Sequence, residues 1–303
     1  MKHLYIIGNG FDLFMGLKTS YQDFREWLKF HYIFVYEALE SVYGIQNIEW
    51  WNDFEVSLGK LDIDKYVKSF APPEKSIGEI LKEIEEKRKK EQKLPNLPPS
   101  LTPESPCADR LRGLLDILHD CMRKWIQSMR SFENLKYVNL DKECSFFLNF
   151  NYTETLEWFY HISKSQILHI HGAAYNEGKL IFGHNHFLYE DRFMYDGGKV
   201  SQVLERYHKN PYEYIYKNEA FFEKVKNVEY IHVYGMSFSP VDIGYLDWIC
   251  EHTPNNTKWE VSWHTDNDKK RIENFILQHR NLKNRLDYIR LDSIENKSVE
   301  MDK

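Results

Sequence analysis

The sequence has few cysteines, no long apolar run and no excess of positive charge. Its four cysteines form no C-x-x-C pair and have no spacing that suits zinc, which indicates a reducing, cytoplasmic setting rather than a disulfide framework. The first apolar run, Leu4 to Leu17, is interrupted by Asn9 and Asp12 and falls short of the roughly 18 apolar residues that a spanning helix needs. We therefore expect no membrane anchor and no signal peptide.

Acidic residues outnumber basic ones by 46 to 40, so the formal net charge is −6. This charge gives no general attraction for phosphate backbones, which argues against nucleic acid as the default partner. A content of 42% apolar residues is typical of a globular chain, and a length of 303 residues allows one large domain or two modest ones. Aromatic residues make up 16% of the chain, enough for a deep core and also for surfaces on which bases could stack.

Proline is concentrated in one part of the chain. Seven of the ten prolines lie within residues 72–106, on both sides of a charged run at 82–93. This composition predicts two linkers around a solvated helix, and so a flexible segment over 72–106. The surrounding residues 20–145 have mainly helical patterns, at Ser20–Tyr43 and Asp109–Met129, which predicts a helical insertion.

Strand patterns alternate with helical patterns over the rest of the chain. Strands are expected at His3–Gly8, Ser145–Phe150, Gln166–Ile170, Lys179–Gly183, Val228–Gly235, Lys258–His264 and Leu286–Leu291. Helices are expected at Glu154–Ser163, Tyr214–Val225, Val241–Glu251 and Asp268–His279. This alternation predicts an α/β, Rossmann-like fold, in which helices flank a mostly parallel sheet and the helical insertion follows the first strand. Ligands of such folds bind at the carboxyl ends of the strands.

A glycine-containing turn, Gly8-Asn9-Gly10-Phe11-Asp12, follows the first strand. Two glycines one residue apart allow the backbone to approach a phosphate whose charge is met by free N–H groups. Leu13 stands where a dinucleotide fingerprint has its third glycine, so a simple tight turn is an equal reading. Asp12 would be repelled by a phosphate and is expected to face a ribose hydroxyl, a cation or a backbone amide.

Polar residues also end three later strands. Asn151, Tyr152 and Thr153 follow the second strand, where Thr153 is either a ligand contact or a helix cap. A His-x-His-Gly motif ending in His171-Gly172 follows the third strand. The segment from Gly235 to Asp242 forms another strand–glycine–helix turn, with Ser239 as the expected N-cap and Pro240 as the first helical residue.

The histidines also allow a metal site. The four residues His169, His171, His184 and His186 lie within 18 positions, but no carboxylate stands beside them at a ligand-like spacing. We expect no tightly bound metal, and keep a site formed by these histidines with Asp12, Asp53 or Glu55 as the alternative. The sequence leaves the roles of Asp53 and Glu55 open.

Taken together, these motifs resemble the bacterial AbiH family of phage abortive-infection proteins. The matching segments span nearly the whole chain outside the proline-rich insertion. They are LYIIGNGFDLFMGLKTSYQDF at 4–24, WNDFEVSLGKLD at 51–62, FLNFNYTETLEWFY at 147–160, ILHIHG at 167–172, LIFGHN at 180–185 and VYGMSFSPVD at 233–242. The resemblance implies a single domain over residues 1–303 and a cytoplasmic antiphage effector. Its candidate partners are a phage-derived trigger, a partner defence protein or a second copy of the chain.

A more distant resemblance links the motifs to sirtuin-like domains, whose glycine turn, Asn-containing turn, His-Gly pair and Gly-x-Ser turn bind and cleave NAD. This resemblance implies NAD as substrate or ligand, with Asn151 and His171 as catalytic residues. The nucleotide-binding residues it implies are Gly8, Asn9, Gly10, Phe11, Asp12, Tyr152, Thr153, Gly235, Ser237 and Asp242. Asp12, Lys18 and Thr153 depart from the sirtuin pattern and the zinc-binding cysteines are missing, so protein deacylation is not expected.

The leading hypothesis is therefore an effector that hydrolyses NAD at the nicotinamide–ribose bond. Histidine can act as a base near neutral pH, and an asparagine can orient the ribose or a water molecule without ionising. The alternatives are a metal-dependent nuclease or phosphoesterase built on the histidines, and a non-catalytic sensor of a nucleotide or a phage protein.

Overall fold

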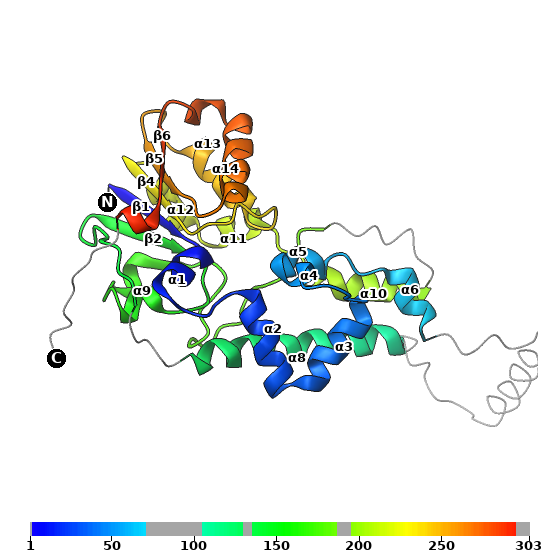
Figure 1. Cartoon of the computed structure of the whole chain (residues 1–303). Helices are drawn as coiled ribbons and strands as arrows, with labels where there is room; N and C mark the ends of the chain where they lie inside the picture. Colours follow the sequence, from blue (N-terminus) through cyan, green and yellow to red (C-terminus); the bar gives the residue numbers. More distant parts are fainter. Residues whose placement is uncertain (1, 71–104, 130–134, 187–194, 295–303) are drawn as a thin grey trace, which may run out of the picture.

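A six-stranded parallel sheet forms the centre of the structure. The computed structural model of the chain describes residues 2–70, 105–129, 135–186 and 195–294. The strands follow the order β3-β2-β1-β4-β5-β6, and every neighbouring pair is parallel. They are β1 His3–Ile7, β2 Ser145–Asn149, β3 Ile167–His169, β4 Tyr230–Tyr234, β5 Lys258–Ser262 and β6 Leu286–Ile289. The predicted α/β, Rossmann-like architecture is confirmed, and the sheet is parallel throughout (Figure 1).

Helices cover both faces of this sheet. One face packs its alternate apolar side chains, among them Leu4, Ile231 and Trp259, against four helices. These are α11 Pro211–Lys217, α12 Glu219–Val225, α13 Ile243–His252 and α14 Asp266–Gln278. The other face packs against α1 Asn9–Met15 and α9 Thr155–Trp158. Burial on both faces explains why the strands read as apolar runs rather than as alternating patterns.

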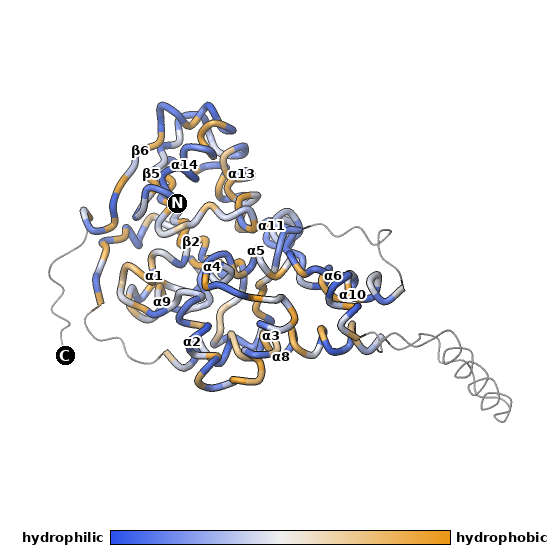
Figure 2. The backbone as a smooth tube through the Cα atoms, turned by 45° about the vertical axis from the view of Figure 1, so that its right-hand side comes forward, coloured by the Kyte–Doolittle hydropathy of each residue, from blue (hydrophilic) through white to orange (hydrophobic). Residues whose placement is uncertain are grey.

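A separate apolar core holds a second layer, made of helices (Figure 1). It contains α2 Tyr21–His31, α3 Ile33–Tyr43, α4 Glu49–Asn52, α5 Phe54–Leu58, α6 Ile63–Lys68, α8 Pro106–Ser128 and α10 Tyr195–Glu205. Hydrophilic and hydrophobic stretches alternate along these helices in Figure 2, as expected where one face of a helix is buried. The segment predicted to be flexible, 72–106, lies outside the described residues except for its last two positions.

Short connecting pieces complete the secondary structure. They are the 3₁₀ turns η1 Lys164–Gln166, η3 Arg280–Leu282 and η4 Leu291–Ser293. No helix in the described ranges combines the length and the apolar character needed to cross a membrane.

Several predicted elements differ from those observed. The strand expected at Lys179–Gly183 is wrong: this segment joins no strand of the sheet, and Ile181 N donates instead to His171 O (2.9 Å), in the turn after β3. The helix expected over Ser20–Tyr43 is broken at Tyr32 into α2 and α3, and a capping box of Ser20 and Asp23 starts α2.

The start of α13 also differs from the prediction. Ser239 and Pro240 belong to a turn, and the helix begins at Ile243 with Asp242 at the N-cap position. The Asp242 side chain makes no capping hydrogen bond. Its carboxylate is therefore available for contacts outside the helix.

The turns after β1 and β4 touch backbone to backbone. Gly8 N donates to Tyr234 O (2.9 Å) and Gly10 N donates to Gly235 O (2.8 Å). Gly235 has a φ of +68°, and a Cβ atom on it would lie 1.9 Å from Phe11 N. A Cβ atom on Gly8 would lie 2.7 Å from Gly235 O. Where these two turns cross, there is therefore no room for a side chain; we refer to this contact as the crossing.

Replacement of Gly235 should test this crossing. We expect Gly235→Ala to lower the free energy of unfolding by at least about 3 kcal/mol, because the left-handed backbone and the clash with Phe11 N both oppose a side chain. The measurement is urea unfolding followed by circular dichroism. Gly113→Ala is the matched control: Gly113 lies exposed in α8, and a Cβ atom on it would meet no other atom within 4 Å, so alanine should stabilise the helix by about 1 kcal/mol. Equal effects of the two substitutions would show that a side chain at Gly235 is tolerated.

Candidate functional site

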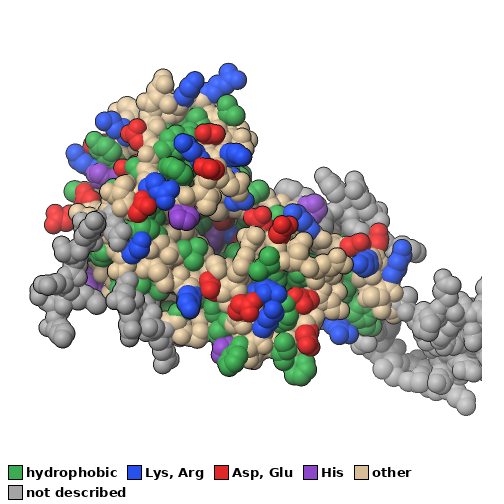
Figure 3. All heavy atoms as spheres, viewed as in Figure 1, with side chains coloured by type: hydrophobic (Ala, Val, Ile, Leu, Met, Phe, Trp, Pro, Cys, Tyr) green, Lys and Arg blue, Asp and Glu red, His purple; other side chains and the backbone are tan. Residues whose placement is uncertain are grey.

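A cavity of about 850 Å³ lies at the carboxyl ends of the strands, between the sheet and the helical layer. Strands β1, β2 and β4 end at the same position along the sheet, because Ile7 pairs with both Asn149 of β2 and Tyr234 of β4. Figure 3 shows a hollow between the two layers on this face of the molecule. The cavity is lined by the residues that follow β1, β2, β3 and β4 and by the α4–α5 region of the helical layer.

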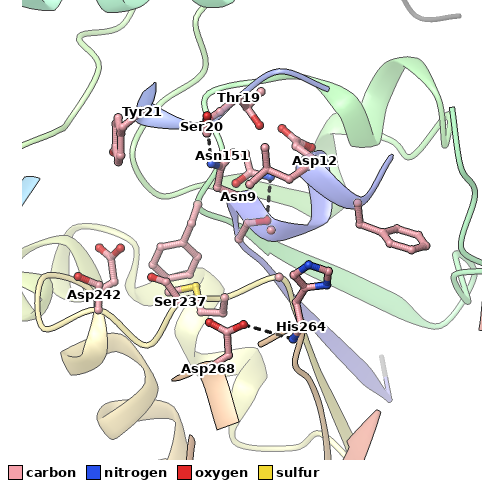
Figure 4. Close-up of a pocket in the computed structure, with 18 of the residues that line it drawn as sticks. Asn9, Asp12, Thr19, Ser20, Tyr21, Asn151, Ser237, Asp242, His264 and Asp268 are labelled. Carbon is pink, nitrogen blue, oxygen red and sulfur yellow. Dashed lines mark hydrogen bonds between the residues drawn. The ribbon is translucent and has the colours of Figure 1, made fainter. Parts of the chain in front are cut away.

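The structure brings the nominated residues together around this cavity. Its lining includes Gly8, Asn9, Gly10, Asp12, Asn151, Tyr152, Thr153, His171, Gly235, Ser237 and Asp242. Figure 4 shows Asn9 and Asn151 at the centre of the site, with Asp12 and Asp242 on opposite sides in that view. Phe11 does not join them: it is fully buried in the core beneath the sheet, beside Tyr160 and Tyr234, and cannot contact a ligand in the cavity.

The glycine turn does not present the free amides that its pattern predicts. Gly8 N and Gly10 N donate to the turn after β4, and Phe11 N donates to Gly8 O (2.9 Å). These three amides are satisfied within the protein and do not form a phosphate cradle. The two glycines instead allow the backbone to pass close to Gly235, so the motif forms a tight structural turn.

Asp12 is a fully buried carboxyl group at the cavity wall. Thr153 donates its hydroxyl to Asp12 Oδ2 (2.5 Å), so Thr153 does not cap the next helix. The other oxygen, Oδ1, has no hydrogen-bond partner among the described residues. Burial raises the pKa of Asp12 to about 6, although the bond from Thr153 opposes the rise.

Asn151 is held by the backbone around it. Its amide Nδ2 donates to Gly8 O (3.2 Å), and its own N–H donates to Asn149 Oδ1 (3.0 Å). Behind it, His169 Nδ1 lies 3.2 Å from Asn151 O, while His169 Nε2 lies 2.8 Å from Glu157 Oε1. Asn151 Oδ1 is buried without a partner in the described part of the chain. The amide is thus fixed in orientation with its oxygen left to accept.

His171 is 2% exposed and lies between aromatic rings. Burial, with a smaller contribution from the charge of Lys209, lowers the pKa of His171 well below its ordinary value, so the imidazole is neutral at neutral pH. Its Nε2 lies 3.4 Å from Asp242 Oδ1 but makes no hydrogen bond with any described residue. The ring therefore has one free nitrogen at the cavity wall.

A buried ion cluster completes the site, and the sequence did not indicate it. Lys209, 2% exposed, donates to Glu55 Oε2 (2.8 Å) and to Asp242 Oδ1 (3.1 Å). Glu55 Oε1 also accepts from Tyr21 OH (2.6 Å) and Tyr152 OH (3.1 Å). Burial opposes the charge of Lys209, but the two carboxylates more than offset this and raise its pKa. Lys209 precedes a helix start in sequence, a position that carries no functional signal.

The four histidines of the alternative metal site make separate contacts. His169 faces Glu157, His171 faces Asp242, and His184 bonds through Nε2 to Leu204 O (3.1 Å). His186 is exposed. Within the described ranges, no group of three or more His, Cys, Asp or Glu side chains is placed to hold a metal ion.

Comparison with known proteins identifies one family. The family model described as "Bacteriophage abortive infection AbiH" matches residues 4–263, which include the turns after β1, β2, β3 and β4 and the ion cluster of Glu55, Lys209 and Asp242. No curated protein and no solved structure matches the chain.

The raised pKa of Asp12 predicts a pH-dependent effect on stability. Because the folded state binds the proton more tightly than an ordinary aspartate with a pKa of 3.8, the free energy of unfolding should fall as the pH rises from about 4 to about 6. The full penalty of ionising Asp12 is about 3 kcal/mol. Asp12→Asn removes it, so the variant should gain stability relative to the native chain between pH 4 and pH 7.5.

Urea unfolding of both proteins at the two pH values measures this gain. Asp64→Asn, a substitution at an exposed carboxylate on α6, should show a similar small effect at both. A gain for Asp12→Asn that does not change with pH would show that Asp12 ionises as freely in the folded chain as in the unfolded one.

Proposed function

Because the chain belongs to the AbiH family of bacteriophage abortive-infection proteins, we propose that it acts in antiphage defence through a nucleotide bound in the central cavity. The nucleotide is NAD, and the reaction is hydrolysis of its nicotinamide–ribose bond. The family itself suggests the antiphage role. The nucleotide and the reaction are inferred from the cavity.

The unpaired polar atoms of the cavity carry this proposal. Asp12 Oδ1, Asn151 Oδ1 and His171 Nε2 are buried, belong to residues that line the same cavity and have no hydrogen-bond partner among the described residues. Each such atom costs about 1–3 kcal/mol when left unpaired. A ligand with hydroxyl groups, such as a ribose, supplies donors to all three and recovers this cost.

The same atoms suit cleavage of a ribosyl bond. As the C1′–N bond breaks, the electron pair leaves with nicotinamide, which becomes neutral, and a water oxygen bonds to the cation-like C1′. The water proton passes to His171 Nε2, which is neutral and free to accept it. The products are ADP-ribose and nicotinamide, and the proton is then released to solvent. Asn151 orients the ribose or the water through its fixed amide.

The phosphates need partners other than the glycine turn. Arg271 and Arg290 line the same cavity, at its β5–β6 side. Arg271 Nη2 lies 3.5 Å from the exposed Asp53, and Arg290 pairs with the exposed Asp292 (3.2 Å). Because exposed ion pairs are weak, a pyrophosphate can replace these carboxylates on the two guanidinium groups. We assign the phosphate contacts to these arginines.

Loss of His171 or Asn151 tests the reaction. His171→Ala should lower the rate of nicotinamide release from NAD by a factor of about 10² to 10⁴ with little change in NAD affinity, because the base acts mainly in the transition state. Asn151→Ala should act in the same direction through lost alignment. The rates are measured by chromatography of purified full-length protein with NAD, in the presence and absence of a chelator.

His186→Ala is the matched control, since His186 is exposed and does not line the cavity. It should retain the native rate. Full turnover by His171→Ala would refute the role of the base. Activity lost with chelator and with His186→Ala would support the metal-dependent alternative, and NAD binding without turnover by the native chain would identify a sensor.

A further inference from the structure

The ion cluster at the helical side of the cavity carries an uncompensated negative charge. Glu55 and Asp242 share one cation, Lys209, and the ion pairs of these two acids in the described chain are with Lys209 and, for Asp242, with His171. His171 is held neutral by burial and does not balance the second acid. The side chains of Glu55 and Asp242 are only 12% and 17% exposed. Water therefore screens this charge poorly.

Aromatic rings enclose the same charge. Tyr21 and Tyr152 both donate to Glu55, and the ring of Phe150 meets His171 edge to face at 5.3 Å. All three rings line the cavity, and Trp51 and Phe54 line it beside them. Faces of aromatic rings attract cations, most strongly where water is excluded. The combination of fixed carboxylates and aromatic walls suits a flat organic cation.

Unpartnered polar atoms indicate that this part of the cavity receives a ligand. His171 Nε2, 3.4 Å from Asp242, and the indole Nε1 of the fully buried Trp51 have no hydrogen-bond partner in the described residues. Both residues line the cavity. The indole N–H can only donate, which matches the carbonyl oxygen of a ring that carries an amide.

We propose that the Glu55–Lys209–Asp242 cluster and its aromatic walls select a planar organic cation, the pyridinium ring of an N-ribosylated nicotinamide, over neutral rings. The identity of the ring rests on the proposed function, whereas the preference for a cation follows from the cluster. A pyridinium loses its positive charge when the ribosyl bond breaks. The product nicotinamide is then held less tightly than the substrate and is released.

Two small probes test the charge preference without any reaction. The cation 1-methylnicotinamide should bind the full-length protein at least about tenfold more tightly than neutral nicotinamide in titration calorimetry, because only the former pairs with the net negative charge. Glu55→Gln and Asp242→Asn each remove one carboxylate and should reduce this ratio toward one. The two variants provide independent tests should one of them fail to fold. Glu49→Gln is the control, because Glu49 is exposed on α4 and does not line the cavity.

The outcomes separate this inference from the proposed function. Equal binding of the two probes, no binding of either, or a preference that survives both carboxylate substitutions would overturn the cation site even if NAD is cleaved. A preference for the cation that Glu55→Gln or Asp242→Asn abolishes supports the site, even if the purified chain releases no nicotinamide from NAD. In that last case the cation site stands and the proposed reaction fails.

Discussion

Backbone contact between two glycine turns determines how the site is built. Gly8 and Gly10, in the turn after β1, donate hydrogen bonds to the carbonyl groups of Tyr234 and Gly235 at the end of β4. A Cβ atom on Gly235 would clash with the backbone of the first turn. This crossing ties the central strands together at the edge where the cavity opens. Asp12, Ser237 and Asp242 reach the cavity from the segments that it joins.

A second contact joins the sheet to the helical layer. Lys209 bonds to Glu55 of α5 and to Asp242, which precedes α13, so one buried cation connects the two layers at the cavity. Loss of Lys209 would leave two buried carboxylates without their shared cation, which is strongly destabilising. The cluster thus has a structural role as well as the electrostatic role proposed for it. The helical layer is in this sense part of the site.

Much of the sheet could be predicted from the sequence, because parallel strands buried on both faces leave apolar runs that end in polar residues. Asn151, His171 and Gly235 line the cavity, and the sequence points to them because they directly follow such runs. The sequence also assigns Phe11 and the glycine amides to nucleotide binding, whereas the structure places them against other parts of the protein. A sequence motif does not distinguish a turn that binds a ligand from a turn that packs against another backbone segment. The sequence offers Glu55 only as a candidate metal ligand and gives no sign of Lys209, because their pairing depends on tertiary contact across 154 positions.

The function proposed here is binding and cleavage of NAD in the cavity during the defence response. The most direct measurement is the NAD concentration in infected bacteria that express either the native chain or Asn151→Ala at equal levels. We expect NAD to fall and nicotinamide to rise after infection only in cells with the native chain, together with loss of protection in the variant. Protection by the native chain with an unchanged NAD concentration would refute NAD cleavage as the function.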